Sequence, residues 1–176
     1  LLESAPLMRR LEPHFHLIGV DLSGHGGSSL PPDDTFTIDR LADDARAALD
    51  AVDVSTAHLF GFSMGASVAL RVAHTSPARV GRLALLGANA AWTDALAEAM
   101  QARLDLDTLR RHDPTRTAAL ESQHEHPERL FRALRRFVGT LPDKTDEMGQ
   151  TLSEVNQPTL VAALDEDPLF SLEDAM

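Results

Sequence analysis

A serine between two glycines is the residue in this sequence best placed to do chemistry. Gly61-Phe62-Ser63-Met64-Gly65 has the G-x-S-x-G pattern of a nucleophile elbow, a strained strand-to-helix corner that exposes the serine hydroxyl in a cleft. We expect both glycines to be required, because side chains there would collide with the adjoining strand and helix. The start of the following helix offers backbone N–H groups to a developing oxyanion, and Met64 would supply the first. The pattern therefore predicts Ser63 as a nucleophile.

The elbow needs a strand before it and a helix after it, and the flanking sequence predicts both. Residues 57–62 form a short apolar run typical of a buried strand, and residues 66–73 carry small and apolar side chains at helical spacing. The alternative is a serine in an ordinary strand-to-helix turn. Phe62 beside the nucleophile and Trp92 further along are candidates for a substrate pocket, although core packing explains each equally well.

The residues before the elbow predict the first part of an α/β sheet. Residues 1–13 indicate a helix, and the apolar run 14–21 is typical of a buried parallel strand. A glycine-rich turn follows at 22–29, which lacks the lysine and the spacing of a phosphate-binding loop. Thr37 is a suitable N-cap for an amphipathic helix that ends near Val52.

Strands separated by helices indicate an α/β fold with a doubly wound, mostly parallel sheet. The apolar runs 80–87 and 158–164 predict two more strands. Between them the periodicity is helical, and prolines divide it into about four helices. The expected divisions are a first core part at 1–91, a helical insertion at 92–155 and a resumed core at 156–176.

Composition limits the classes of partner that this chain is expected to bind. The 176 residues carry a net charge of −11, which argues against nucleic acid and anionic membrane surfaces because both attract basic patches. Cysteine is absent, so the chain has no disulfide and no thiolate metal site. No apolar run approaches the length of a membrane span, and a cytoplasmic location is expected by default.

Several charged or imidazole side chains invite a functional interpretation that the pattern does not favour. Arginines at helical spacing between 129 and 136 are expected to form a solvated helix face. His124 and His126 form a His-x-His pair, but two histidines without placed partners do not make a metal site, so no metal is assigned. His58 begins the elbow strand at the end opposite Ser63, too far away to act on it.

At this point four stretches, taken in order, resemble the α/β-hydrolase superfamily, and in particular its capped, esterase-like serine hydrolases. They are the strand and turn 19–28, the elbow 58–65, the strand 80–87 and the strand 158–163. The resemblance implies a partial α/β-hydrolase sheet with a helical cap inserted at residues 92–155. It implies Ser63 as the nucleophile and the Met64 N–H as one donor of the oxyanion hole.

The resemblance also implies the triad acid and shows what is missing. Asp167, after the strand 158–163, matches the position of the family's acid, with Asp165 as the second choice and a solvated run of carboxylates as the alternative. The family's order is nucleophile, acid, histidine, but no histidine follows Asp167, and the strand with the His-Gly oxyanion loop is absent. That strand would lie between 14–21 and 57–62. The two interpretations are an internal fragment of a longer hydrolase and a degenerate homologue that has lost its base. We expect the fragment, since deleting a central strand would cost more than a domain's stability.

The implied function is hydrolysis of a small carboxylic ester, lactone or thioester through a serine acyl-enzyme, without a cofactor. The implied partner is a small-molecule acyl substrate, and the oligomeric state is left open. His25, in the Gly-His-Gly turn, is expected to be structural or to lie near the substrate. The alternatives are another reaction on the same scaffold (cofactor-free haloperoxidase, carbon–carbon bond hydrolase, acyltransferase) or a non-catalytic ligand-binding homologue.

Overall fold

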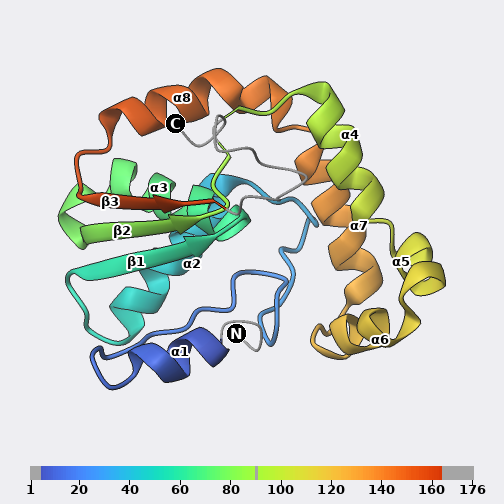
Figure 1. The fold of residues 1–176 in the computed structure, drawn as a ribbon, viewed down its shortest axis with the longest axis horizontal. Helices are drawn as coiled ribbons and strands as arrows, with labels where there is room; N and C mark the ends of the chain where they lie inside the picture. Colours follow the sequence, from blue (N-terminus) through green and yellow to red (C-terminus); the bar gives the residue numbers. More distant parts are fainter. Residues whose placement is uncertain (1–4, 90, 164–176) are drawn as a thin grey trace.

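The computed structural model describes residues 5–89 and 91–163, which are built on a three-stranded parallel sheet with the order β1-β2-β3. The strands are β1 (Ala57–Phe62), β2 (Val80–Leu86) and β3 (Thr159–Ala162), and they lie side by side in Figure 1. These positions confirm the strands predicted at the elbow, at 80–87 and at 158–164. Helices connect them, as parallel strands require, and the predicted α/β fold class is confirmed.

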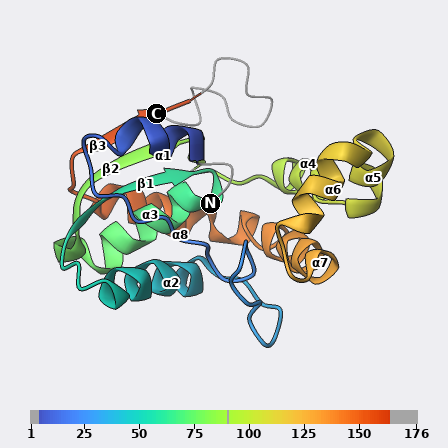
Figure 2. The ribbon, with the colours of Figure 1, turned by 90° about the horizontal axis from the view of Figure 1, so that it is seen from below.

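Two helices cover one side of this sheet. Thr37 caps α2 (Ile38–Ala51), and its hydroxyl accepts a hydrogen bond from the Arg40 N–H at 3.1 Å, as the sequence predicts. The second is α3 (Met64–Thr75), which follows directly from β1. Figure 2 shows α2 and α3 on one side of the strands and α1 (Ala5–Leu11) on the other.

The elbow strand is not buried on both faces, which corrects the sequence expectation for residues 57–62. Gly61 is buried against α3, but Phe60 and Phe62 are 48% and 56% exposed. Leu160, in register with Phe60 through β2, is 66% exposed. A parallel sheet is buried on both faces only when helices cover both. In the described part of the chain α2 and α3 cover one face, and on the other face the side chains of Phe60, Phe62 and Leu160 stay largely exposed.

The strand predicted at 14–21 is absent, and this prediction is wrong. In the structure the segment has no regular secondary structure, and Phe15 and Val20 are 52% and 36% exposed. A strand exists only with a partner for its backbone hydrogen bonds. In the resembled fold another strand separates this segment from β1, and none of the described residues occupies that place.

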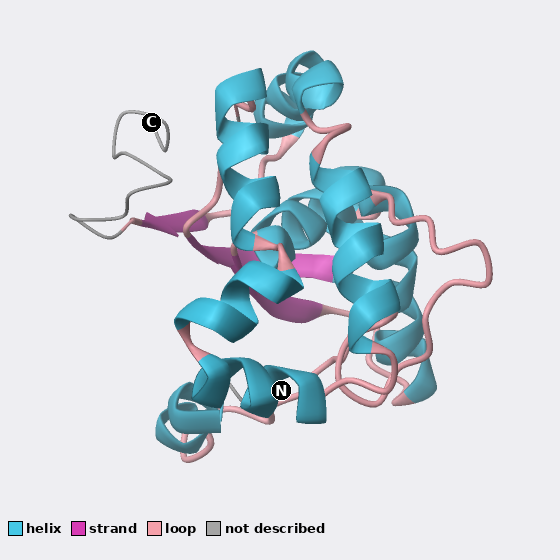
Figure 3. Cartoon of the chain, turned by 90° about the vertical axis from the view of Figure 1, so that its right-hand side faces the viewer, coloured by secondary structure: helices cyan, strands magenta, loops and turns pink. Residues whose placement is uncertain are grey.

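The helical periodicity after Trp92 corresponds to five α-helices rather than four. They are α4 (Asp94–Arg103), α5 (Leu106–His112), α6 (Pro114–Ser122), α7 (Pro127–Val138) and α8 (Thr145–Glu154). Two of the prolines begin helices, because proline at the first helical position lacks only an N–H that would be unpaired anyway. In Figure 3 helices stand in the foreground and the strands lie behind them. Over 5–89 and 91–163, no helix combines the length and apolar character that crossing a membrane requires.

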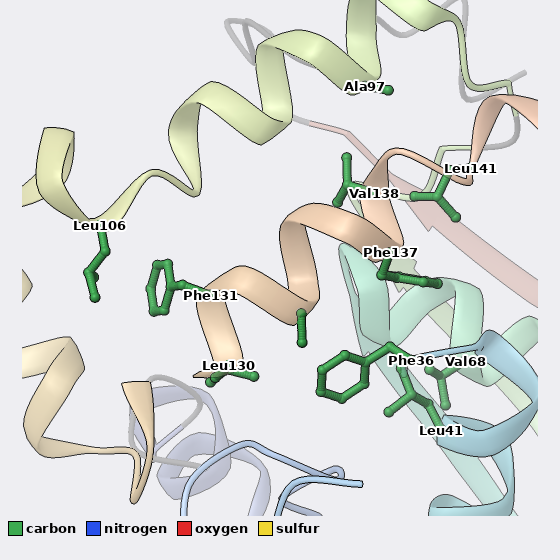
Figure 4. Packing of buried hydrophobic residues seen from close by; sticks show 11 residues of the cluster. Phe36, Leu41, Val68, Ala97, Leu106, Leu130, Phe131, Phe137, Val138 and Leu141 are labelled. Carbon is green, nitrogen blue, oxygen red and sulfur yellow. The ribbon is translucent and has the colours of Figure 1, made fainter. Parts of the chain in front are cut away.

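Helix α7 joins the helical segment to the sheet side of the molecule. Leu130, Phe131 and Phe137 on α7 belong to one buried cluster with Phe36 and with Val68 of α3. Figure 4 shows Phe137 beside Phe36, and Phe131 facing Leu106 of α5. The cluster therefore holds α4, α5 and α7 against α2 and α3 through apolar burial.

The opposite face of α7 carries the arginines that the sequence predicts to be solvated. They are exposed, but two of them form ion pairs: Arg129 with Asp34 at 2.6 Å and Arg135 with Asp105 at 2.9 Å. Exposed pairs contribute about 0–1 kcal/mol each. They orient α7, and the apolar cluster supplies the stability.

Replacing Leu130 tests whether the apolar cluster supplies the stability. Leu130 is 1% exposed, so Leu130→Ala should lower the free energy of unfolding by about 2–5 kcal/mol in urea titrations. Leu160→Ala makes the same chemical change at a position that is 66% exposed and should cost about 0.5 kcal/mol. Equal losses from the two variants would contradict the assignment of the core to α7.

Candidate active site

The corner between β1 and α3 has the backbone geometry of a strained turn. Ser63 has φ 50° and ψ −118°, an uncommon conformation for a residue with a side chain. The corner is held by two hydrogen bonds of 2.9 Å, from the Ser63 N–H to the Leu86 carbonyl and from the Ala66 N–H to the Ser63 carbonyl. The neighbouring strand therefore fixes the position from which the half-buried Ser63 side chain projects.

The two glycines of the motif have different roles, which corrects the expectation that both are sterically required. A Cβ on Gly61 would lie 2.3 Å from the Gly65 carbonyl oxygen and 2.6 Å from the Ala66 Cα. A Cβ on Gly65 would meet no atom of the described chain within 4 Å. Gly61 is needed for the close crossing of strand and helix, whereas Gly65 leaves open space beside Ser63.

Met64 and Trp92 lie close to the same apolar cluster. Met64 is the first residue of α3, so the helix itself offers its N–H no partner, and its side chain packs on the cluster that contains Phe137. Trp92 also packs on that cluster, and its backbone exchanges two hydrogen bonds with the Thr145 hydroxyl, at 3.0 and 2.9 Å. Trp92 therefore anchors the start of the helical segment.

Two further predicted site residues, Phe62 and Trp92, lie in the described part of the chain. Phe62 is 56% exposed on β1, and neither Phe62 nor Trp92 is among the residues that line the cavity described below. Their assignment to a substrate pocket stays a prediction. Asp167 and its alternative Asp165 lie outside the described residues. No group of three metal-binding side chains occurs within 5–89 and 91–163.

The glycine-rich turn 22–29 contacts the loop before α7, which the sequence did not indicate. The Gly26 N–H donates a hydrogen bond of 3.1 Å to His124 Nδ1, so this nitrogen carries no proton. His25 donates from Nδ1 to the Ser23 carbonyl at 3.0 Å, and its ring meets those of Phe36 and His124 edge-on. Burial lowers the pKa of His25, outweighing the Ser23 carbonyl and Asp21, which raise it. His25 is therefore a neutral structural residue of this turn at neutral pH.

A cavity of about 170 Å³ lies beside α3, and its most unusual wall residue is Asn89. Asn89 is 6% exposed and lies just after β2. The sequence predicted a strand ending there, without a role for Asn89. The wall residues come from the start of α2, from α3 and from the α7–α8 region: Phe36, Thr37, Ile38, Asp39, Ser67, Leu70, Arg71, Asn89, Phe137, Thr140, Leu141, Lys144, Glu147, Thr151 and Leu152.

Comparison with known proteins finds one family model and several relatives that match parts of this chain. The family model described as the alpha/beta hydrolase fold matches residues 2–141. The dihydrolipoyllysine-residue acetyltransferase component of the acetoin cleaving system from Pseudomonas putida is 43% identical over 72 residues, which are 40% of this chain and 19% of that protein. The 2-hydroxymuconate semialdehyde hydrolase of Pseudomonas sp. strain CF600 is 37% identical over 81 residues, which are 46% of this chain and 29% of that protein.

Longer matches have lower identity. A putative carbamate hydrolase of Agrobacterium fabrum is 25% identical over 186 residues, covering 93% of this chain and 69% of that protein. The solved enol-lactonase of Burkholderia xenovorans LB400 superposes with a TM-score of 0.74 at 23% identity, covering 99% of this chain and 72% of that chain. The chain thus spans less than a third of the curated relatives to which it is 37–43% identical.

The two elbow glycines provide a matched pair of variants. Gly61→Ala should lower the free energy of unfolding by about 1–3 kcal/mol or more, because its Cβ meets backbone that cannot move aside. Gly65→Ala lies in α3 without a clash and should raise stability by up to about 1 kcal/mol. Urea unfolding measures both. A neutral Gly61→Ala would contradict the close crossing of β1 and α3.

His25 should make stability depend on pH. Its pKa in the folded chain lies below the ordinary value of 6.5, so the unfolded chain binds the proton more readily. The contribution of neutral His25 is complete above pH 6.5 and is lost as the pH falls through the lowered pKa. His25→Gln should flatten the decline of unfolding free energy in this window, measured by urea titration at several pH values. His14→Gln, at an exposed position, is the control and should keep the wild-type slope.

Proposed function

Because the chain belongs to the α/β-hydrolase fold family, we propose that Ser63 is the nucleophile of a serine hydrolase acting on a small carboxylic ester, lactone or thioester. The observation that carries the proposal is the backbone of Ser63, with φ 50° at the corner between β1 and α3. A strained conformation of this kind persists only where surrounding contacts hold it, and such sites are concentrated where chemistry occurs.

The proposed reaction has two stages. Ser63 Oγ attacks the acyl carbon while a histidine takes its proton, and the carbonyl oxygen becomes an oxyanion that accepts a hydrogen bond from the Met64 N–H. Collapse of this intermediate expels the alcohol or thiol, which receives the proton from the histidine. Water, activated by the same histidine, then attacks the acyl-serine and releases the acid. Asp167 holds the imidazole in the required tautomer.

Three of the described histidines already have hydrogen-bond partners. In the described chain His25, His74 and His124 hydrogen-bond to the Ser23 carbonyl, to Glu154 and to the Gly26 N–H. The chain also spans only part of its relatives. We therefore place the base and the second oxyanion donor in parts of the intact protein beyond these 176 residues.

The relatives support a hydrolytic reaction and leave a second candidate reaction. The enol-lactonase and the putative carbamate hydrolase support attack on a carboxyl-type carbonyl. The similarity to 2-hydroxymuconate semialdehyde hydrolase favours carbon–carbon bond hydrolysis as the second candidate. In either case residues 92–155 would roof the pocket and select the substrate, with Phe62 and Trp92 near the acyl group. We propose a cytoplasmic enzyme without a cofactor and with no nucleic acid or membrane partner.

Removing the nucleophile is the direct test. In the intact protein Ser63→Ala should lower kcat for a p-nitrophenyl ester by about 10⁴-fold or more, because the covalent step is lost. The same change should abolish labelling by a fluorophosphonate, which phosphonylates an activated serine and releases fluoride. Ser122→Ala, at an exposed site on α6, should leave both rates unchanged. Undiminished turnover in Ser63→Ala would refute the proposal, and turnover of a dienoate semialdehyde but not of esters would favour the second candidate.

The source of the base has a separate test. The 176-residue chain alone should show no multiple turnover of the nitrophenyl ester, because no triad histidine is present. Multiple turnover that His25→Gln removes, with unfolding free energy retained at pH 8, would assign the base to His25 instead.

A further inference from the structure

Thr145 joins the two chain segments through which residues 93–144 leave the sheet and return to it. The Trp92 N–H donates a hydrogen bond of 3.0 Å to the Thr145 hydroxyl, and this hydroxyl donates one of 2.9 Å to the Trp92 carbonyl. Trp92 lies just before α4, and Thr145 is the first residue of α8. In Figure 1 helices α4 to α7 stand to the right of the sheet, and α8 runs above it. One side chain therefore closes the base of this helical segment.

The start of α8 does not explain why residue 145 is a threonine. A threonine near a helix start commonly accepts a hydrogen bond from a nearby N–H of the same helix. The Thr145 hydroxyl instead bonds a residue that lies 53 positions away in the sequence. A hydroxyl can accept and donate at once, so it matches the adjacent N–H and carbonyl of a single residue. We infer that this side chain serves the connection to Trp92.

Trp92 is also connected to the corner that carries Ser63. The Leu86 carbonyl at the end of β2 accepts the Ser63 N–H at 2.9 Å, and a short connection leads from Leu86 to Trp92. The side chains of Trp92 and Met64 both pack against the buried cluster built on α7. Movement of Trp92 would therefore be felt beside the candidate nucleophile.

The other end of the pair is held on the sheet side through α8. Val155, directly after α8, packs against the buried cluster that contains Val72 of α3. Nε2 of His74 on α3 lies 2.7 Å from a carboxylate oxygen of Glu154 at the end of α8. Because α8 is attached to α3 in this way, Thr145 offers Trp92 a partner whose position is set by the sheet side of the molecule.

Apolar packing and the Trp92–Thr145 pair act differently on the helical segment. Burial in the cluster on α7 supplies free energy, but it is non-directional and does not by itself select one orientation. Hydrogen bonds require narrow ranges of distance and angle, so a hydroxyl bonded to both sides of one peptide unit fixes where the segment begins. We propose that Thr145 is a positioning residue of the Ser63 site, which sets the placement of residues 93–144 and thereby the binding of substrate. This inference rests on the proposed hydrolase function.

Kinetics of two variants test this role. In the intact protein Thr145→Val removes both hydrogen bonds at nearly constant shape, and KM for a p-nitrophenyl ester should rise by roughly fivefold or more, the net worth of two neutral hydrogen bonds. Substrate selects the correctly placed segment, so a smaller populated fraction raises KM and leaves kcat unchanged. Thr145→Ser keeps the hydroxyl and should restore the wild-type KM.

Thr117→Val is the matched control, because it makes the same chemical change inside the helical segment. The Thr117 hydroxyl donates to the Asp113 carbonyl at 2.7 Å, far from the Trp92–Thr145 pair in the sequence and within the same segment. This variant should keep the wild-type KM. Urea unfolding verifies that each variant folds.

Amide hydrogen exchange separates positioning from a general loss of stability. Thr145→Val should speed exchange of the Trp92 amide by roughly fivefold or more, while the amides of β2 and α3 keep their wild-type rates. Thr145→Ser and Thr117→Val should match the wild type at Trp92. An equal rise at all these amides would mean that the variant only destabilises the whole fold, and it would overturn the proposal.

The outcomes distinguish this inference from the proposed function. An unchanged KM in Thr145→Val, a fall in kcat alone, or a Thr145→Ser variant that behaves like Thr145→Val would overturn the positioning role. If Ser63→Ala kept full esterase activity, the proposed function would fail. A role for Thr145 in placing residues 93–144 would then be decided by the exchange pattern alone.

Discussion

The close crossing of β1 and α3 at Gly61 is the constraint on which the other features depend. A Cβ added to Gly61 would lie only 2.3 Å from the Gly65 carbonyl oxygen, so strand and helix cross in close contact and the helix starts immediately after the strand. The chain makes that turn at Ser63 by adopting φ 50°. The same turn leaves the Met64 N–H at the free end of α3, where the helix offers it no partner.

Helix α3 links this corner to the rest of the molecule. Val68 belongs to the cluster built on α7, while Ala69 and Val72 pack with β2 on the sheet side. Displacing α3 would therefore disturb both clusters at once. The cavity that Asn89 lines lies along the same helix, so α3 both carries the corner with the candidate nucleophile and forms one wall of the cavity.

Local features of the fold could be predicted from the sequence, and features that depend on distant partners could not. The elbow strand, the Thr37 cap and the helix after Ser63 follow from spacing and residue type within a few positions. The run 14–21 has the composition of a strand, but without a neighbour to pair with it is not one. In the same way, Gly26 and His124 are 98 residues apart in the sequence, so no local pattern predicts their hydrogen bond. Nor does any local pattern predict that the buried side-chain nitrogen of Asn89 lacks a partner in the described chain. The different roles of Gly61 and Gly65 required knowing where the helix carbonyl lies.

The exposed apolar side chains on one face of the sheet affect how copies of this chain interact with one another in solution. Phe60, Phe62 and Leu160 leave apolar side chains exposed on one face of the sheet, and exposed apolar surface favours contacts between molecules. The net charge of −11 opposes such contacts by mutual repulsion. Because dissolved salt shortens the range of that repulsion to about 10 Å at 0.1 M, we expect ionic strength to control how readily copies of this chain associate through these exposed apolar side chains.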